Sequence, residues 1–400
     1  MKYDFDLMPD RRGMDAIAID SIGSPGAPAA PKEGFSAIPM WVADMNFAAC
    51  PAIQDAVIRR VQHPAFGYFD PSRAYYDAII SWQRDRNGVE NLSSRHIGYE
   101  NGVLGGVVST LNVLCSRGDT VLLQSPTYIG FTHVLENNGY RIIINPMKRD
   151  EAGIWRLDYE DMEKKIVEHH IHATIFCNPH NPCGRVWEPE EIRKAMEIFE
   201  RHGVWVVSDE IWSDLLLNGA RHTPTQSVCD YARFHTAAFY APSKTFNLAG
   251  LVGSYHIIYS DWLRDRQTKE ASLSAYNSMN VLSMHALIGA YGPEGREWVD
   301  QLRTVLSRNV NDAYDFILRH FDGITLMKPQ GTYMLFLHCE EWCRKHNKNV
   351  GDLLKAGTDV GVAWQDGRMF NDPFGIRMNL ALPHTVVMEA FSRLKEYVFA

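Results

Sequence analysis

The sequence predicts an α/β protein with a largely parallel sheet and a smaller α+β domain at its C-terminal end. From about residue 50 to residue 290, short apolar stretches alternate with amphipathic, helix-like stretches. Continuous apolar strands of this kind are typical of a parallel sheet that helices cover on both faces. After about residue 290 one long helical stretch leads into mixed strands and helices, which favours a separate α+β unit.

The elements follow a loop rich in Pro, Gly and Ala at residues 21–34. Helical periodicity predicts helices at 51–61 and 72–86, and Ser72 is a suitable N-cap for the second. Strands are predicted at 120–123, 141–144, 173–177, 204–207, 237–240 and 254–258, with amphipathic helices at 158–168 and 188–202.

The C-terminal part is predicted to contain a helix at 294–320, strands at 324–327, 333–337 and 376–379, and a last helix at 384–397. The length of the chain, 400 residues, allows two to three domains. We expect residues 1–49 to form an N-terminal arm and part of the small domain. Residues 50–289 are expected to form the large domain, and residues 290–400 the C-terminal small domain.

Composition is typical of a soluble globular protein, and we expect a cytoplasmic location. The net charge of −8, with no basic stripe, argues against nucleic acid as a partner. The first residues lack an apolar signal region and no apolar run is long enough for a bilayer, so we expect neither secretion nor a membrane. Seven cysteines, an odd number, suggest reduced thiols. Cys339, Cys343 and His346 resemble metal-ligand spacing, but no second pair accompanies them, and we expect helix-borne thiols and no metal.

Two side chains at predicted strand ends carry the main chemical signal. Asp209 follows an apolar strand, at the carboxyl end where ligands of open α/β sheets collect. Lys244 lies just beyond the next strand, among small and polar residues. Taken singly, the aspartate could merely cap a turn and the lysine could be an ordinary surface residue.

Two further turns suit a cofactor. The stretch from Asn178 to Gly184 contains two Asn-Pro pairs and forms a rigid double turn that can present an amide, although such turns often bind nothing. Residues 100–106 form a Gly-rich turn that follows a short strand and opens a helix, a weak but suitable signal for phosphate. An amide, a carboxylate and an amine, in this order along the chain, are the groups that pyridoxal 5'-phosphate (PLP) requires.

Six motifs in order, from about residue 36 to the C-terminus, resemble fold-type I PLP enzymes. Within that superfamily they are most similar to the MalY/PatB-type cystathionine β-lyases, also called cysteine-S-conjugate β-lyases. The motifs are MWVADMNF at 40–47, FGY at 66–68, NPHNPCG at 178–184, VSDEI at 207–211, APSKTFNLAG at 241–250 and RMNLA at 377–381. The resemblance implies a seven-stranded, mostly parallel sheet between helices, a homodimer with a shared active site, and an amino-acid substrate.

The resemblance also implies roles for individual residues. Lys244 and Asp209 are the expected catalytic residues, the first bonding to the cofactor aldehyde and the second to its ring nitrogen. The expected cofactor-binding residues are Gly102, Val103, Tyr128, Asn181, Asp209, Trp212, Ser243 and Lys244, with Tyr68 contributed by the partner subunit. The expected substrate-binding residues are Arg377, Val42 and Ala43, and Arg377 clamps the substrate carboxylate. Ordinary packing for Tyr128 and a surface ion pair for Arg377 are the alternatives.

This chain departs from the family pattern at two places. Trp212 stands where such lyases usually carry His and aminotransferases Tyr, and its indole can donate one hydrogen bond but cannot act as acid or base. Residues 13–20 replace a more polar pattern, and the loop at 21–34 is longer than usual. In the family, the N-terminal part lies near the substrate entrance, so the resemblance implies that these changes bear on substrate identity and not on the cofactor.

The resemblance predicts β-elimination from L-cystathionine, L-cysteine or related cysteine S-conjugates. Lys244 removes the Cα proton, a thiolate leaves from Cβ, and the remaining fragment hydrolyses to pyruvate and ammonia. An aminotransferase of an L-amino acid shares the proton abstraction and differs in needing a keto acid. A PLP-binding regulatory or interaction protein, of a different class, would bind the cofactor without turnover.

Overall fold

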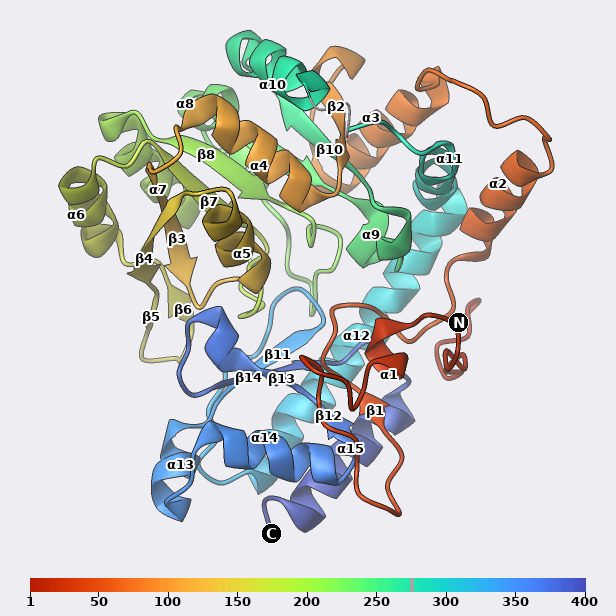
Figure 1. Ribbon diagram of the computed structural model, residues 1–400, viewed down its shortest axis with the longest axis vertical. Coiled ribbons are helices and arrows are strands. Elements are labelled where there is room, and N and C mark those ends of the chain that lie inside the picture. Colours follow the sequence, from red (N-terminus) through yellow and green to blue (C-terminus); the bar gives the residue numbers. More distant parts are fainter. Residues whose placement is uncertain (274–276) are drawn as a thin grey trace.

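The computed structural model describes residues 1–273 and 277–400, and its centre is a seven-stranded sheet (Figure 1). The strand order is β2-β10-β9-β8-β7-β3-β4. Only β10 runs antiparallel to its two neighbours, and the other adjacent pairs are parallel. The predicted, largely parallel sheet is therefore confirmed. Its strands are β2 (Ile97–Asn101), β3 (Thr120–Ser125), β4 (Arg141–Pro146), β7 (Ala173–Cys177), β8 (Trp205–Asp209), β9 (Thr236–Tyr240) and β10 (Gly253–Ile258).

Helices cover both faces of this sheet. Along β3, Val121 and Leu123 pack into one apolar cluster and Leu122 into another, because successive side chains of a strand point to opposite faces. The first cluster includes side chains of α4 (Val103–Leu114), α5 (Ile129–Asn137) and α10 (Asp261–Leu273), and the second those of α6 (Tyr159–His169), α7 (Pro189–His202) and α8 (Asp230–His235). Burial on both faces explains why the strands are continuously apolar.

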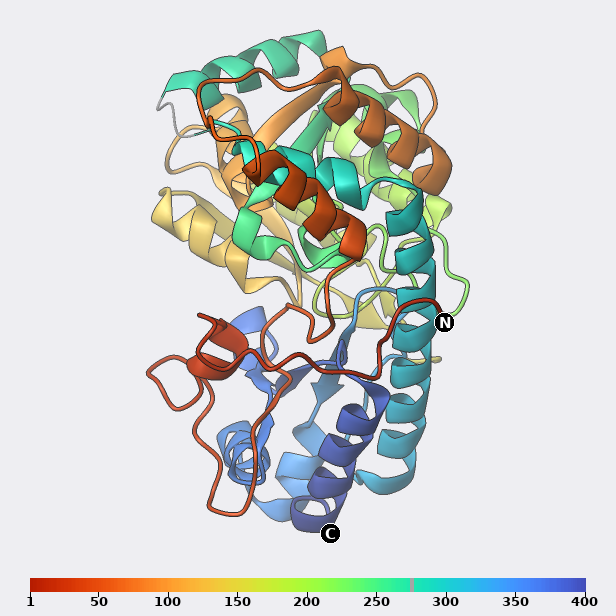
Figure 2. The ribbon, with the colours of Figure 1, turned by 90° about the vertical axis from the view of Figure 1, so that its right-hand side faces the viewer.

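A second group of elements lies below the sheet in Figure 1, and the long helix α12 (Pro293–His320) runs from one part to the other (Figures 1 and 2). Its sheet has the order β11-β14-β13. The short strand β1 pairs in parallel with β12, so the N-terminal segment joins this part. The elements are β1 (Ile38–Pro39), β11 (Met334–His338), β12 (Val362–Ala363), β13 (Gln365–Asp366), β14 (Gly375–Asn379), α13 (Glu340–His346), α14 (Val350–Asp359) and α15 (His384–Tyr397).

The remaining elements connect or flank these two parts. They are α1 (Ile17–Asp20), α2 (Pro51–Val61), α3 (Arg73–Asn87), α9 (Pro242–Thr245), α11 (Val281–Ala290), β5 (Lys148–Arg149) and β6 (Trp155–Arg156). The predicted N-cap of α3 is confirmed, since the Ser72 side chain accepts a hydrogen bond from the Tyr75 amide. Within the described ranges, none of the helices combines the length and apolar character that crossing a membrane requires.

The prediction of a strand at 324–327 is wrong. Only Thr325 pairs with the neighbouring strand, through an isolated bridge to His338. The chain then turns away toward the double turn at 178–184, because the amide of Gln330 donates to the carbonyl of Gly184 at 2.8 Å. All seven cysteines are free thiols, and Cys343 lies within α13 as expected.

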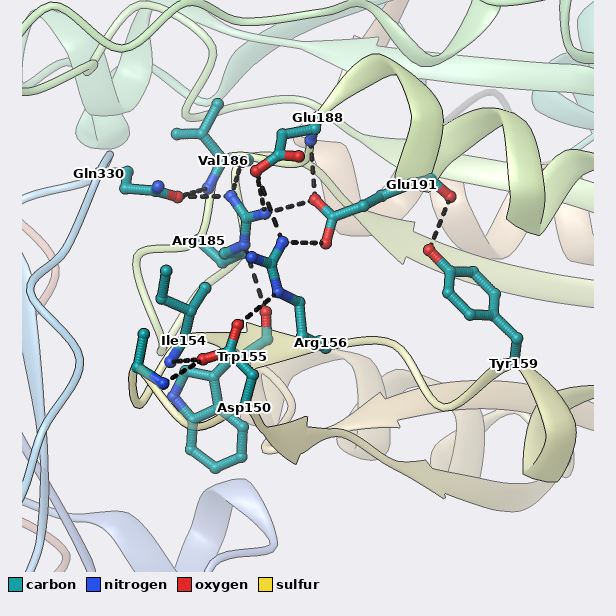
Figure 3. A network of polar contacts seen from close by, with 11 residues as sticks. Asp150, Ile154, Trp155, Arg156, Tyr159, Arg185, Val186, Glu188, Glu191 and Gln330 are labelled. Atoms are coloured by element: carbon teal, nitrogen blue, oxygen red, sulfur yellow. Dashed lines mark hydrogen bonds and ion pairs between the residues drawn. The ribbon is translucent and has the colours of Figure 1, made fainter.

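A buried arginine joins this turn to its surroundings (Figure 3). Arg185 donates to the Trp155 carbonyl at 3.2 Å and to the Gln330 side chain at 2.6 Å. It also forms ion pairs with Glu188 and Glu191. The network holds the double turn against α7 and the chain around residue 330, and so fixes one wall of the site described next.

Candidate active site

The carboxyl ends of the parallel strands open onto a cavity of about 280 Å³. Strand β8 ends in Asp209, β9 leads into α9 with Lys244, and β2 leads into the first turn of α4. Open α/β sheets bind ligands at this edge because the loops that follow the strands converge there. Nine of the residues predicted for the site line the cavity, namely Ala43, Gly102, Val103, Tyr128, Asn181, Asp209, Trp212, Ser243 and Lys244.

Asp209 is a buried carboxylate with little hydrogen bonding, since its side chain is 4% exposed. Within the described chain its one side-chain hydrogen bond comes from the Ile211 amide, at 3.0 Å. Burial raises the pKa of Asp209 to about 7, although that amide and the Lys244 charge act in the opposite direction. A cation that entered the cavity would therefore find a carboxylate in need of a partner.

Lys244 points its amine at the N-terminal segment, where Nζ donates to the Ala43 carbonyl at 2.9 Å. Burial, and next the charge of Arg377, lower the pKa of Lys244 to about 8. A substantial neutral fraction near pH 8 makes this amine both a nucleophile and a base. The helix that carries it is anchored by the next residue, because Thr245 donates to the buried Asp214 carboxylate at 3.0 Å.

The opposite end of the cavity suits an anion. Gly102 is the residue before α4 and has φ +81°, a left-handed conformation that favours glycine. The helix begins at Val103, so its first amides and its dipole face the cavity. Ser243 adds a hydroxyl to the same lining. A phosphate group fits these donors.

Asn181 and Arg377 form a bonded pair at the side of the cavity. Arg377 Nη1 donates to the Asn181 Oδ1 at 3.0 Å. Because a guanidinium only donates, the amide oxygen is the atom that faces it, and the amide NH₂ remains for the cavity. Arg377 does not line the cavity itself; it is buried behind Asn181 with its Nε unpartnered in the described structure. Burial lowers the pKa of Arg377 to about 10, a value that leaves it charged.

Two aromatic side chains border the cavity. Tyr128 stands directly before α5, and a Cβ at position 130 would lie 2.4 Å from its ring, so Gly130 makes room for it. Trp212 is 2% exposed and packs edge-on against Tyr333, with ring centroids 4.8 Å apart. Lys244 Nζ lies 5.9 Å from the centre of the indole ring. Trp212 therefore contacts the reactive end of the site but supplies no proton-transfer group.

Besides Arg377, two of the predicted residues do not line the cavity, namely Val42 and Tyr68. Val42 is beside the cavity in the segment 41–46, and its carbonyl accepts from Asn379 at 2.8 Å. Tyr68 is fully exposed on the loop between α2 and α3, where it lines a separate hollow with Tyr99. A single chain thus does not bring Tyr68 to its own cavity.

Sequence reasoning missed several residues that fix the site. Asn247 exchanges two hydrogen bonds with the backbone of Met45, at 3.0 and 2.9 Å. Asn379 holds the same segment from the other side, and the Gln365 side chain accepts from Arg377. The two asparagines lie within motifs already noted, three residues after Lys244 and two after Arg377. The position of Gln365 carries no comparable signal in the sequence.

The donor set fits PLP. The first turn of α4 and Ser243 suit its phosphate, the Asn181 amide its ring oxygen, Asp209 its ring nitrogen, and the Lys244 amine its aldehyde. The buried Asp209 carboxylate, with a single donor among the described residues, is the observation that fits most directly. A protonated ring nitrogen would supply the hydrogen-bond donor that this carboxylate lacks among the described residues.

Fold and site together define a member of a large enzyme family. The profile of the family described as "Aminotransferase class I and II" matches residues 40–394, and this chain belongs to that family.

Among curated relatives, the chain is 35% identical to "Cystathionine beta-lyase PatB" of Bacillus subtilis (strain 168), over 98% of each chain. It is 29% identical to "Protein MalY" of Escherichia coli (strain K12), over 84% of this chain and 83% of that protein. Among solved structures it resembles the PLP-bound C-S lyase from Staphylococcus hominis, with a TM-score of 0.88 and 26% identity. That match covers 100% of this chain and 98% of the other.

Proposed function

We propose that this protein is a PLP-dependent carbon–sulfur β-lyase. Its substrates would be L-cystathionine, L-cysteine or related cysteine S-conjugates, and its products a thiol or sulfide, pyruvate and ammonia. The observation that carries the proposal is the meeting of the Lys244 amine and the Asp209 carboxylate at one cavity. Support comes from the names of the relatives, which include a cystathionine β-lyase and a C-S lyase.

When bound, PLP supplies an electron sink for the charge released at the substrate Cα. Asp209 would hold the ring nitrogen in its protonated form through its carboxylate. The α4 amides and Ser243 would hold the phosphate, and the Asn181 amide would hold the ring oxygen. Tyr128 would border the ring, since it lines the same cavity. These contacts fix the distance between the substrate Cα and Lys244.

Lys244 moves the proton. Its neutral amine removes the proton from Cα, and the Cβ–S bond then breaks with its electron pair on sulfur. The Lys244 ammonium returns the proton to the departing thiolate, so charge and protons balance. Water then converts the unsaturated amino-acid fragment to pyruvate and ammonia. Lys244 is the one amine among the described residues that line the cavity. Trp212 cannot replace it, because an indole can neither take up nor release the proton.

The substrate carboxylate is assigned to Arg377 and to the backbone of Val42 and Ala43. Arg377 already points Nη1 toward Asn181, next to the cavity, and its Nε has no partner in the described part of the chain. A planar guanidinium with unused donors suits bidentate binding of a carboxylate. Substrate binding would complete these bonds.

We also propose a homodimer in which Tyr68 of one subunit enters the cavity of the other. The supporting observation is the exposure of neighbouring aromatic residues on one loop, Phe66 at 56% and Tyr68 at 111%. Exposed aromatic clusters favour association. Sedimentation at equilibrium tests the dimer, and complementation tests the sharing: mixed Tyr68→Ala and Lys244→Ala subunits should regain activity that neither has alone. The expected cytoplasmic location stays a prediction.

The test of the function is an assay of pyruvate and ammonia with L-cystathionine or L-cysteine and no keto acid. Equal amounts of both products support the lyase. Activity that appears only when a keto acid is supplied would instead identify an aminotransferase. Bound cofactor without turnover in either assay would favour a binding or regulatory role.

A further inference from the structure

Asp44 directly follows Ala43, the residue whose carbonyl accepts the Lys244 hydrogen bond. Its two carboxylate oxygens have different surroundings. Oδ2 pairs with Arg11 Nη2 at 2.7 Å. Oδ1 is shielded from water and has no hydrogen-bond partner among residues 1–273 and 277–400. A buried oxygen without a donor is unfavourable, so this oxygen is able to accept a hydrogen bond from a nearby donor.

The backbone around Asp44 is held from two sides. Asn247 exchanges two hydrogen bonds with Met45, the next residue. Asn379 donates to the carbonyls of Val42 and of Asp44 itself. These bonds fix the backbone of Asp44 next to Ala43, and the ion pair with Arg11 orients its carboxylate.

The charges that face Lys244 come from three parts of the chain. Arg377 on β14 disfavours a proton on the amine, whereas Asp44 on the N-terminal segment and Asp209 at the end of β8 favour it. Arg11 lies behind Asp44 and pairs with it. In the proposed function Asp209 is occupied by the ring nitrogen of the cofactor. Asp44 is then the carboxylate that remains for Lys244.

Tyr333 is a further titratable group near Asp44. Its hydroxyl is buried and unpartnered within the described residues. Burial, and next the charge of Asp44, raise the pKa of Tyr333 well above its usual value, so the phenol stays neutral. It supplies no charge that competes with Asp44.

We propose that the Asp44 carboxylate is the counterion of Lys244 whenever that amine carries a proton, and that Arg11 sets how much negative charge Asp44 presents. The inference rests on the proposed function, in which Lys244 takes up the Cα proton and gives it away again. A buried ammonium next to Arg377 is unfavourable without an opposite charge. Asp44 acts through Lys244 and is a positioning residue.

The test is the pH dependence of the Lys244 amine itself. In the full-length protein stripped of cofactor, acetylation of Lys244 by acetic anhydride would be followed against pH by mass spectrometry of its peptide. Asp44→Asn removes the charge and keeps the shape, so the midpoint should fall by about one pH unit or more. Arg11→Met leaves the Asp44 charge unpaired, and the midpoint should rise. Asp10→Asn, which disrupts the exposed Asp10–Arg12 pair of the same arm, is the control and should change nothing.

Opposite shifts separate the proposal from general loosening of the site. Loosening lets water reach Lys244 and raises the midpoint in both variants, because burial is the largest cause of its low pKa. An unchanged or raised midpoint in Asp44→Asn overturns the proposal. If Asp44→Asn does not fold, an unchanged or lowered midpoint in Arg11→Met overturns the proposal instead. Failure of the pyruvate assay with both shifts present would overturn the function and leave the counterion standing.

The holoenzyme gives a second readout. Lys244 must be neutral to remove the Cα proton, so the acid limb of the kcat profile follows its pKa. In Asp44→Asn this limb should move to lower pH and the plateau should fall about tenfold, since a weaker base abstracts the proton. A lower plateau with an unmoved limb would mean that Asp44 is merely structural.

Discussion

Arg185 and Arg377 are both buried, but their hydrogen bonds are completed to different degrees. Arg185 bonds through Nε and both Nη atoms, to backbone carbonyls, to Gln330 and to two glutamates (Figure 3). Arg377 has neutral partners at its Nη atoms and none at Nε among the described residues. The first arginine lies outside the cavity lining, and the second lies directly behind it.

The neighbouring carboxylates Asp209 and Glu210 differ in the same way. Glu210 accepts bonds from the Ser208 hydroxyl, the Thr225 amide, His222 and Tyr240, at 2.7 to 3.0 Å. The Asp209 side chain accepts one within the described chain. Buried polar groups in native proteins are normally satisfied, so groups left incomplete indicate where a ligand binds. Arg185 and Glu210, whose hydrogen bonds are complete, support the backbone of the site. Arg377 and Asp209, whose hydrogen bonds are incomplete, are the groups expected to bind substrate and cofactor.

The largest effect is expected from Lys244→Ala, which removes the reactive amine from the cavity that Asp209 also lines. Without a base at Cα, turnover should fall by at least about 10³-fold in the pyruvate assay. The control is Lys355→Ala, at an exposed lysine of α14 that pairs with Asp359. Near-normal activity of Lys244→Ala would end the assignment of this residue.

Asp209→Asn should make the cofactor-free protein more stable at high pH. Because the folded-state pKa of Asp209 is raised, from 3.8 to about 7, the folded protein binds this proton more tightly than the unfolded chain. Its contribution to stability is therefore lost as pH rises from about 4 to 7, by about 4 kcal/mol in all. Urea unfolding at pH 5 and pH 8 should show about 3 kcal/mol of this loss in the parent protein and none of it in the variant. Equal pH dependence in both would contradict the assignment.

Glu210→Gln is the matched substitution at the carboxylate whose hydrogen bonds are complete. It should lower the stability of the protein, whereas Asp209→Asn should raise it. The amide would bring an NH₂ group against donors such as Tyr240, so the free energy of unfolding should fall by about 3 kcal/mol. The same urea measurement at pH 8 decides this. A neutral effect would mean that the network is not needed for stability.

Substitution of the two buried arginines should affect different properties, stability for Arg185 and substrate binding for Arg377. Arg185→Met removes the hydrogen bonds to the Trp155 carbonyl and the Gln330 side chain, so the free energy of unfolding should fall by about 3 kcal/mol. Glu191 loses one ion pair and keeps the other, with Arg156. Arg377→Met should leave stability within about 1 kcal/mol and raise KM at least about tenfold, through loss of the carboxylate clamp. Thermal unfolding and steady-state kinetics on both variants provide the check. A large loss of stability in Arg377→Met would break the comparison.

The smallest effect is expected at Thr245, which anchors the helix of Lys244. Thr245→Val keeps the shape and removes one hydrogen bond to Asp214, at a cost of about 1 kcal/mol in unfolding free energy. Thr245→Ser should restore it. If Ser does not differ from Val in urea unfolding, the hydroxyl bond is not the cause.

Local patterns in the sequence predict much of this fold and site. Apolar strands alternating with amphipathic helices predict the sheet, and the strand-end positions of Asp209 and Lys244 predict that both reach one edge. The strand predicted at 324–327 is wrong because a distant partner, the turn at Gly184, redirects the chain. Pairing of Arg11 with Asp44 and bonding of Asn379 to residue 42 depend on tertiary contacts, which no short sequence window contains.

The hydrogen bonds that hold the segment 41–46 determine when the active site can form during protein synthesis. The two sets of hydrogen bonds span 202 positions to Asn247 and more than 330 to Asn379. During synthesis the N-terminal segment leaves the ribosome long before its second partner is translated. The wall opposite Lys244 can close only when nearly the whole chain has emerged, so stable loading of the cofactor is expected after translation and to depend on an intact C-terminus.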